Sequence, residues 1–225
     1  MEILINSPRG VDLYDLAGLA AEKGFDGIQL YLDPGLATDA EGLEAWRGHL
    51  EDRGLTLAVH LPPAPAPGVI TALERIARPG TPVISHYPAE PLAPSAGRAA
   101  WEFSPFGVRT GDYEQWLRHC RRAGALPVLD LPRLFNGTDE QEACRFAGAL
   151  FSRLAGQRYL LHLIDCDTEE QNRDDWCELG RGRVGRCLER LTFPLPELAV
   201  LEYESMIQAV NSLPWLRVLA RQLGH

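Results

Sequence analysis

Leu57-Ala58-Val59-His60 is a short apolar run that ends on a side chain capable of chemistry, and the same pattern recurs along the whole chain. Apolar runs of this length, bounded by polar or turn-forming residues, are typical of buried strands. The runs of this kind are Ile3-Leu4-Ile5-Asn6, Gly27-Ile28-Gln29-Leu30-Tyr31, Leu57-Ala58-Val59-His60, Val83-Ile84-Ser85-His86, Ala100-Trp101-Glu102-Phe103, Val128-Leu129-Asp130, Leu160-Leu161-His162-Leu163 and Ala199-Val200-Leu201-Glu202. They predict eight strands.

Amphipathic segments lie between these runs, as in folds where helices alternate with parallel strands. The shortest step between two run ends is the 16 residues from His86 to Glu102, and a parallel crossover needs at least about 10–12 residues. That step holds Pro88, Pro91 and Pro94, so we expect the fourth helix to be reduced or replaced by a loop. The fold predicted is α/β: one compact (β/α)8 TIM barrel, a single domain over residues 1–225.

Apolar residues spaced three or four apart, such as Leu43 and Trp46, predict the intervening helices. In the last of these segments, Asn211 or Ser212 followed by Pro214 is typical of a helix cap and first turn. We therefore expect the final helix to begin there.

The last polar side chain of each run indicates where the function lies. In TIM barrels the active site forms at the carboxyl ends of the strands, so these side chains are expected to converge. They are Asn6, Gln29, His60, His86, Glu102, Asp130, His162 and Glu202. One such residue could be a hydrogen-bonded structural group. Several carboxylates crowded at one rim instead require a bound cation or shared protons.

The runs of the last four strands predict the metal ligands, which are Glu102, Asp130, His162 and Glu202. Oxygen and nitrogen donors without a thiolate suit a divalent metal ion cofactor, with Mn²⁺ favoured and Mg²⁺, Co²⁺ and Zn²⁺ as alternatives. Glu204 has the same strand parity as Glu202 and is its rival. Glu202 is preferred because it directly ends the apolar run.

The composition excludes several classes of protein. A formal net charge of −9 argues against nucleic acid or an anionic membrane as partner. Lys23 is the one lysine, at a predicted helix end, and no Gly-Lys-Ser/Thr sequence exists, which disfavours Schiff-base chemistry and a P-loop. The chain shows no signal peptide and no apolar run of membrane length, and its five cysteines lack a Cys-x-x-Cys pair. We expect a cytoplasmic protein with reduced thiols.

Several segments resemble a known family when they are taken in order and at barrel spacing. They are Gly24-Phe25-Asp26-Gly27-Ile28-Gln29-Leu30, Ala58-Val59-His60, Ala100-Trp101-Glu102-Phe103-Ser104-Pro105-Phe106-Gly107, Val128-Leu129-Asp130-Leu131-Pro132-Arg133 and Leu161-His162-Leu163-Ile164-Asp165. The chain resembles the sugar phosphate isomerase/epimerase family, whose members have a xylose-isomerase-like TIM barrel. The resemblance implies a metal held by the four predicted ligands, and Glu102 and Glu202 as catalytic groups that move protons.

The activity that this resemblance implies is a divalent-metal-dependent isomerase or epimerase of carbohydrate metabolism. Its substrate would be a small sugar or a sugar-like hydroxy-carbonyl compound. A divalent ion that bridges a carbonyl and a neighbouring hydroxyl stabilises the enediolate formed when a carbon-bound proton leaves. Glu102 and Glu202 would face opposite sides of that carbon, one as base and the other as acid.

The chain also departs from the family pattern. Arg133 stands where the family often has histidine, and arginine can clamp a carboxylate or phosphate, which favours an anionic substrate. Gln29 stands where glutamate is common. The predicted substrate-binding residues are His60, His86, Arg133, Asn6 and Gln29. Asp165 is a candidate to orient His162, and a solvated loop carboxylate is the alternative.

Other functions stay open from the sequence. A lyase, dehydratase or oxidase could use the same scaffold, a shortened barrel could bind a ligand without catalysis, and a homo-oligomer is compatible with the chain. An apurinic-site endonuclease-like hydrolase would use His60 and His86 as metal ligands, but Arg133 and Trp176 replace histidines that it needs, and the acidic charge suits DNA poorly. Gly180-x-Gly182 resembles a phosphate loop, although two glycines before a helix usually form a turn.

Overall fold

The computed structural model describes residues 1–87, 97–170 and 173–224. Its barrel strands are β1 (Glu2–Asn6), β2 (Gly27–Tyr31), β3 (Thr56–His60), β4 (Pro82–Tyr87), β5 (Arg98–Phe103), β6 (Leu126–Asp130), β7 (Leu160–Leu163) and β10 (Leu198–Leu201). The helices are α1 (Leu13–Lys23), α2 (Ala40–Asp52), α3 (Pro67–Ile76), α4 (Thr110–Ala123), α5 (Leu131–Phe135), α6 (Glu140–Leu154), α7 (Arg183–Arg190) and α8 (Met206–Leu223). Two short 3₁₀ helices, Leu36–Thr38 and Arg173–Asp175, and a small antiparallel pair, β8 (Asp165–Cys166) with β9 (Trp176–Cys177), complete the elements.

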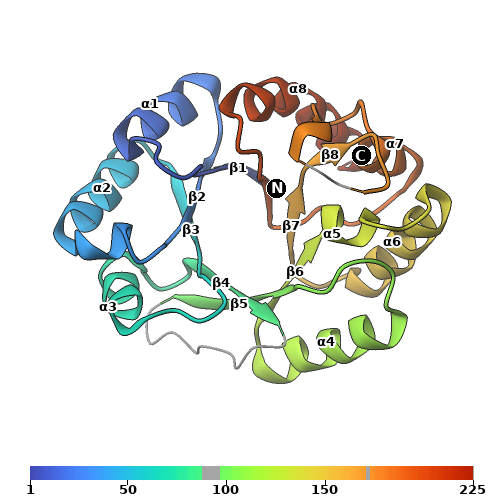
Figure 1. The fold of residues 1–225 in the computed structure, drawn as a ribbon, viewed down its shortest axis with the longest axis horizontal. Helices are drawn as coiled ribbons and strands as arrows, with labels where there is room; N and C mark the ends of the chain where they lie inside the picture. The colour runs from blue at the N-terminus through green and yellow to red at the C-terminus, as the bar shows by residue number, and fades with distance from the viewer. Residues whose placement is uncertain (88–96, 171–172, 225) are drawn as a thin grey trace.

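The eight parallel strands close into a barrel in the order β1-β10-β7-β6-β5-β4-β3-β2, with the longer helices in a ring outside it (Figure 1). Each predicted apolar run overlaps one barrel strand. The predicted (β/α)8 TIM barrel is therefore confirmed.

The strands β4 and β5 pair directly, with Pro82 opposite Arg98 at one end and Tyr87 opposite Phe103 at the other. The expected reduction of the fourth helix concerns the proline-rich residues 88–96, which lie outside the described part of the chain. The register of this pair places His86 beside Glu102.

The inside of the barrel explains where the polar strand ends point. Its apolar filling includes Leu4, Ala58, Ile84, Ala100, Val128, Leu160 and Val200. Side chains alternate between the two faces of a strand, so the residue two positions later also faces inward. His60 follows Ala58 in this way, and Glu102 follows Ala100. The polar ends therefore form the next interior layer, at the carboxyl end of the barrel.

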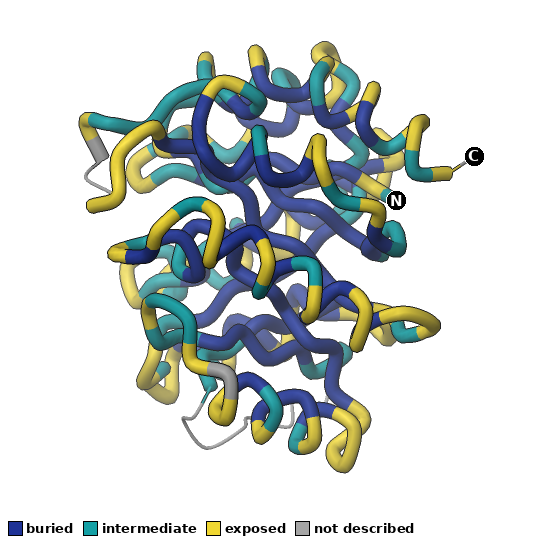
Figure 2. The backbone as a smooth tube through the Cα atoms, turned by 90° about the vertical axis from the view of Figure 1, so that its right-hand side faces the viewer, coloured by how far each residue is buried: buried dark blue, intermediate teal, exposed yellow. Residues whose placement is uncertain are grey.

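The outer faces of the strands pack against the helices. Trp46 on α2, Trp116 on α4 and Phe151 on α6 are all buried in this outer core. Truncating a buried aromatic residue of this size to alanine costs roughly 3–5 kcal/mol. Figure 2 shows the result, a buried strand layer enclosed by helices with exposed outer sides. The helix ring thus holds the strands and their polar ends in place.

The turn from α1 into β2 accounts for the Gly24-Phe25-Asp26-Gly27 segment. Gly24 ends α1 in the left-handed region, at φ 83°, where glycine is favoured. The Asp26 carboxylate accepts a hydrogen bond from the backbone N–H of Ile3, 2.8 Å away, which ties the turn to β1. A Cβ on Gly27 would lie 2.1 Å from the carbonyl oxygen of Thr56, so this strand approaches β3 too closely for any side chain.

The final helix begins earlier than its sequence indicates. Ser205 caps it, α8 runs from Met206, and Pro214 lies inside it. The expected cap at Asn211 or Ser212 is therefore wrong. An interior proline costs a helix about 3 kcal/mol, but α8 buries Leu213 and other apolar side chains against the barrel, and that burial offsets the cost.

A disulfide joins Cys144 of α6 to Cys187 of α7, with Cα atoms 5.4 Å apart. The expectation that every thiol is reduced is wrong for this pair, because packing of α6 beside α7 brings together two cysteines that are 43 positions apart in sequence. The free cysteines are Cys120, Cys166 and Cys177. Among the described residues, none of the helices is both long and apolar enough to cross a membrane.

Candidate metal centre and active site

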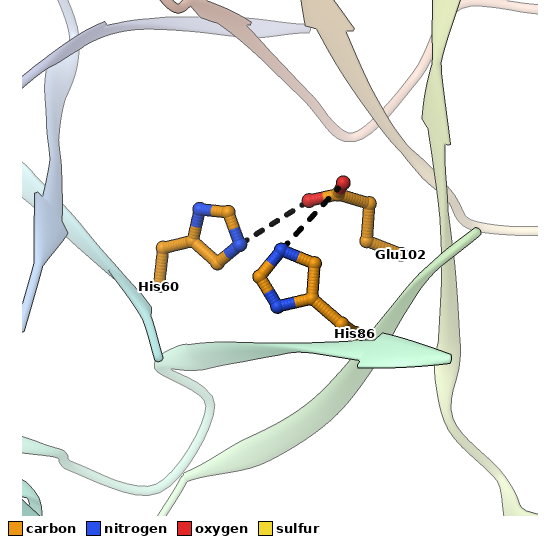
Figure 3. Close-up of side chains that lie close together, drawn as sticks. All are labelled: His60, His86 and Glu102. Atoms are coloured by element: carbon orange, nitrogen blue, oxygen red, sulfur yellow. Dashed lines mark ion pairs between the residues drawn. The ribbon is translucent and has the colours of Figure 1, made fainter. Parts of the chain in front are cut away.

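Buried and half-buried polar side chains gather at the carboxyl end of the barrel, where the sequence predicted a site. They are His60, His86, Glu102, Asp130, His162 and Glu202, from β3, β4, β5, β6, β7 and the end of β10. Parallel pairing sets His86 beside Glu102 and Asp130 beside His162. In Figure 3 the rings of His60 and His86 both point toward the Glu102 carboxylate.

Glu102 is the centre of this cluster and is 1% exposed. Its Oε2 lies 3.2 Å from Nε2 of His60 and 3.5 Å from Nδ1 of His162. Its Oε1 lies 2.9 Å from Nε of Arg133 and 4.0 Å from Nε2 of His86. Neither oxygen accepts a well-aligned hydrogen bond in these contacts. A buried carboxylate in that state has spare capacity for a cation.

Asp130 and Arg133 form the second part of the cluster. The backbone N–H of Arg133 donates to Oδ1 of Asp130 at 3.1 Å, so Asp130 caps α5. The Arg133 side chain folds back and donates through Nε to Oδ2 of Asp130 at 2.7 Å. Its Nη1 donates to the Ser104 carbonyl oxygen at 2.9 Å, and its guanidinium lies 5.3 Å from the centre of the Phe106 ring. Arg133 is therefore fixed against the carboxylates.

Glu202 is held from the other side of the barrel mouth. The amide of Gln29 donates to Oε1 of Glu202 at 2.6 Å, and Nδ1 of His162 lies 3.2 Å from Oε2. His60 Nδ1 is 3.8 Å from Oε1. Gln29 is itself fully buried. The Gln29 amide nitrogen thus supports Glu202, and the role of Gln29 in substrate binding stays a prediction.

Burial and charge shift the pKa values of the cluster in different directions. Burial opposes ionisation of Glu102, but His162 and His60 outweigh it and hold the Glu102 pKa well below its usual value. Burial also opposes a charged His162, yet Glu202 and Glu102 prevail and raise its pKa to about 10. Burial and then the charge of Glu102 raise the pKa of Asp130 to about 7. The pKa of His86 is lowered, chiefly by burial.

The donor set fits a divalent metal ion. Potential ligand atoms of Glu102, Asp130 and His162 lie within 4.8 Å of one another, and Glu202 adjoins His162. Both Glu102 oxygens, both His162 ring nitrogens and Nε2 of His60 are buried without an aligned hydrogen-bond partner. Buried oxygen and nitrogen atoms without a hydrogen-bond partner are the kind of ligand atoms that a bound cation would satisfy. The sequence prediction of these four ligands is thus compatible with the geometry.

A second group with ligand spacing is formed by His60, His86 and Glu102, again with potential ligand atoms within 4.8 Å of one another. The two histidines were predicted to bind substrate. Because His60 approaches the Glu102 oxygen that also faces His162, and His86 approaches the other oxygen, both histidines are also potential metal ligands.

A cavity of about 440 Å³ opens onto the cluster. Of the predicted site residues it is lined by Asn6, His60, Asp130, Arg133 and Glu202, and the rival Glu204 lines it as well. Residues that the sequence analysis did not assign to the site also line it, and they include Arg9, Tyr31, Asn136 and Trp176. Of these four residues, Tyr31 is the one that the sequence could have indicated as a site residue, because it ends the second apolar run. Trp176 reaches the cavity because it lies on β9.

Asp165 does not orient His162 as predicted. Its buried carboxylate accepts hydrogen bonds from backbone N–H groups of Cys166, Gly180, Gly182, Val184 and Gly185, at 2.9–3.1 Å. Burial raises the Asp165 pKa and these hydrogen bonds oppose that rise. The carboxylate fills the anion-binding position at the start of α7, so the Gly180-x-Gly182 segment holds an internal anion in place of a phosphate.

The turn before α7 requires glycine because the Asp165 carboxylate and neighbouring backbone atoms approach it too closely for a side chain. A Cβ on Gly182 would lie 2.4 Å from Oδ1 of Asp165, and a Cβ on Gly185 would lie 2.6 Å from Oδ2 and 2.4 Å from the Cα of Gly180. The turn and its carboxylate therefore form one packed unit. It fixes the segment that carries β9 and Trp176 at the edge of the cavity.

Comparison with known proteins supports the fold. No protein-family model and no curated protein sequence matches the chain. Among solved structures, endonuclease IV from Thermus thermophilus superposes with a TM-score of 0.61 at 16% identity, covering 99% of this chain and 100% of that one.

Two further solved structures show the same likeness. A xylose isomerase domain protein from Alicyclobacillus acidocaldarius has a TM-score of 0.62 at 18% identity, and both chains are covered completely. D-allulose 3-epimerase from Methylomonas sp. has a TM-score of 0.59 at 14% identity, with 97% of this chain and 98% of that chain covered. At such identities the likeness concerns the fold, and the structural neighbours of this chain are xylose-isomerase-like TIM barrels, sugar epimerases and endonuclease IV among them.

Proposed function

We propose that the protein is a divalent-metal-dependent isomerase or epimerase that acts on a small sugar or sugar-like hydroxy-carbonyl compound. The observation that carries the proposal is the convergence of Glu102 and Glu202 on one imidazole. Their carboxylate oxygens lie 3.5 Å and 3.2 Å from Nδ1 of His162. Two carboxylates in one small site are the groups that a proton transfer between two faces of a carbon requires.

Both glutamates are expected to be ionised and able to accept a proton. Burial opposes this for Glu202 also, but the nearby charge of His162 outweighs burial and lowers the Glu202 pKa. The Glu202 side chain is 16% exposed and lines the cavity, whereas that of Glu102 is 1% exposed. We therefore assign the removal of a carbon-bound proton to Glu202, with Glu102 as the deeper partner.

A divalent cation held by Glu102, His162 and Glu202, with Asp130 beside them, would polarise the substrate carbonyl and so stabilise negative charge on its oxygen. The chain itself performs the proton steps. The substrate C–H bond breaks as Glu202 takes the proton, and a new C–H bond forms when a proton is returned from a carboxylic acid of the site. Gln29 holds Glu202 during the transfer through its 2.6 Å hydrogen bond.

The cavity limits the substrate to a small molecule. Its volume of about 440 Å³ suits a monosaccharide-sized ligand, and its lining combines carboxylates, amides and aromatic rings. Tyr31 and Trp176 supply apolar surface, and Asn6 and Asn136 supply hydrogen-bonding groups at the rim. A compound that presents hydroxyl groups and a carbonyl matches this combination.

The test is proton exchange from solvent. The protein loaded with Mn²⁺ is incubated in D₂O with a panel of keto and aldo sugars, and carbon-bound deuterium is measured by mass spectrometry. Incorporation that depends on the added metal and is lost in Glu202→Gln supports the proposal. Glu204→Gln is the matched control, because that carboxylate lines the same cavity. Normal metal binding without exchange on any substrate would contradict the proposal and favour a binding or lyase role.

A second candidate is a metal-dependent hydrolase of phosphodiesters. It is favoured by the His60, His86 and Glu102 group, which offers ligands beyond those of a single ion. It is opposed by the net charge of −9, which repels a polyanionic substrate. Cleavage of an oligonucleotide with one abasic site, measured with the same metal-loaded protein, separates the two candidates.

A further inference from the structure

Arg133 occupies an unusual place for an arginine, inside the group of candidate metal ligands. Its Nε lies 2.7 Å from Oδ2 of Asp130 and 2.9 Å from Oε1 of Glu102. Within the described residues, no other arginine or lysine forms an ion pair with these two carboxylates. The guanidinium thus stands where the two carboxylates face each other.

The position of Arg133 is fixed from several directions. The Ser104 carbonyl accepts from Nη1 at 2.9 Å, the Phe106 ring lies under the guanidinium, and its own backbone N–H donates to Oδ1 of Asp130. Because these contacts already restrict the guanidinium, little additional conformational entropy is lost when it stays between the carboxylates. Its positive charge is therefore held in a fixed position beside the two carboxylates.

The guanidinium divides the cluster into two unequal parts. Both oxygens of Asp130 are engaged, one with the backbone and one with the side chain of Arg133. The opposite oxygen of Glu102 faces His60 and His162, and Glu202 closes the same side through its 3.2 Å contact with His162. The potential ligand atoms that have no positive charge of Arg133 beside them therefore lie on the side away from Arg133.

We propose that Arg133 is a built-in cation that takes the place of a metal ion at Asp130 and at one oxygen of Glu102. The protein then has room for a divalent ion on the side of His60, His162 and Glu202, and it binds that ion more weakly than the same carboxylates would without the arginine. Asp130 acts mainly as the partner of Arg133. The inference rests on the metal site of the proposed function.

The inference is tested by metal binding, independently of activity. Metal-stripped full-length protein and Arg133→Gln are titrated with Mn²⁺ by calorimetry, and bound metal is counted after dialysis. Loss of a positive charge within a few ångströms of a divalent ion is expected to tighten Mn²⁺ binding by about tenfold or more. The metal-free variant should also melt at a lower temperature than the wild type, and added Mn²⁺ should raise its melting temperature by more.

Two matched variants keep the test decisive. Arg133→Lys retains the charge without the planar fork and should bind Mn²⁺ with nearly wild-type affinity, which separates charge from shape. Arg109→Gln removes an equal charge from an exposed arginine and should leave Mn²⁺ affinity unchanged. If Arg133→Gln bound Mn²⁺ as the wild type does, or more weakly, the proposal that Arg133 is a built-in cation would be wrong. The metal site of the proposed function would still be supported. If the wild type and both Arg133 variants all failed to bind, the metal site itself would be refuted and the inference with it.

Discussion

Glu102 and Glu202 contact the same atom, Nδ1 of His162, although one extends from β5 and the other follows β10. The strand β7, which carries His162, lies between β10 and β6 in the closed barrel. The strand order β10-β7-β6-β5 therefore brings the two carboxylates to one imidazole. This arrangement gives the site two candidate proton carriers and one group of metal ligands in the same small volume.

Glu202→Gln should abolish catalysis while leaving the fold intact. The amide keeps the size of the side chain and loses the base, and removal of a general base typically lowers the rate about 10²–10⁴-fold. The measurement is the rate of deuterium incorporation into a substrate that the wild type exchanges. A Glu202→Gln protein that exchanged at the wild-type rate would assign the proton transfer elsewhere, with Glu204 as the next carboxylate to test.

Removal of the metal should destabilise the wild type and leave Glu102→Gln unaffected. A ligand at a hundred times its dissociation constant stabilises the folded state by about 2.7 kcal/mol. Chelation with EDTA should lower the melting temperature accordingly. In Glu102→Gln the central carboxylate is gone, so addition and removal of Mn²⁺ should give the same melting curve. A metal-dependent shift that persisted in this variant would exclude Glu102 as a ligand.

Asp165→Asn should destabilise the fold without altering metal ligands. In the wild type, backbone N–H groups such as those of Gly182 and Gly185 donate to the Asp165 carboxylate. In the variant, the asparagine NH₂ group would face some of these N–H donors and could not accept their hydrogen bonds. Loss of hydrogen bonds to a buried charged group should lower the free energy of unfolding by about 2–3 kcal/mol, as measured with urea.

The matched control for this change is Asp167→Asn, since Asp167 is exposed and pairs with Arg186 at the surface. It should cost less than about 1 kcal/mol. Equal effects of the two substitutions would contradict a structural role for Asp165. Equal Mn²⁺ affinity of Asp165→Asn and wild type would agree with the absence of a contact between Asp165 and the metal ligands.

The pH dependence of stability should include a contribution from Glu140 at the start of α6. The hydrogen bond from Arg186 on α7 lowers the Glu140 pKa below its ordinary value of 4.5. A carboxyl whose pKa is lower in the folded state stabilises the fold above its unfolded pKa and loses that contribution as the pH falls through the folded pKa. Because the pair is partly exposed, the contribution should be at most about 1 kcal/mol.

Unfolding in urea, measured from neutral pH down to below the carboxyl range, checks this prediction. The difference in stability between the wild type and Glu140→Gln should be present at neutral pH and should shrink as the solution becomes acidic. A difference that stayed constant with pH would show that Glu140 acts through packing and not through its charge.

The fold could be predicted because its signal is local. Each strand, such as Leu57-Ala58-Val59-His60, is an apolar run with one polar end, and alternation of side chains along a strand fixes that end on the inside of the barrel. The errors arose where tertiary contacts override local preference. Pro214 lies inside α8, and Cys144 meets Cys187, because helix packing decides both.

By itself, the sequence determined the barrel and the rim on which Glu102, His162 and Glu202 lie, because strand periodicity and strand ends can be read residue by residue. The tertiary structure decided the partners. It placed Gln29 on Glu202, Asp165 in the turn before α7, and Arg133 between Asp130 and Glu102. The physical reason is that a side chain's length and rotamer select its neighbour across the barrel mouth, and several neighbours of suitable charge lie within reach of each polar end.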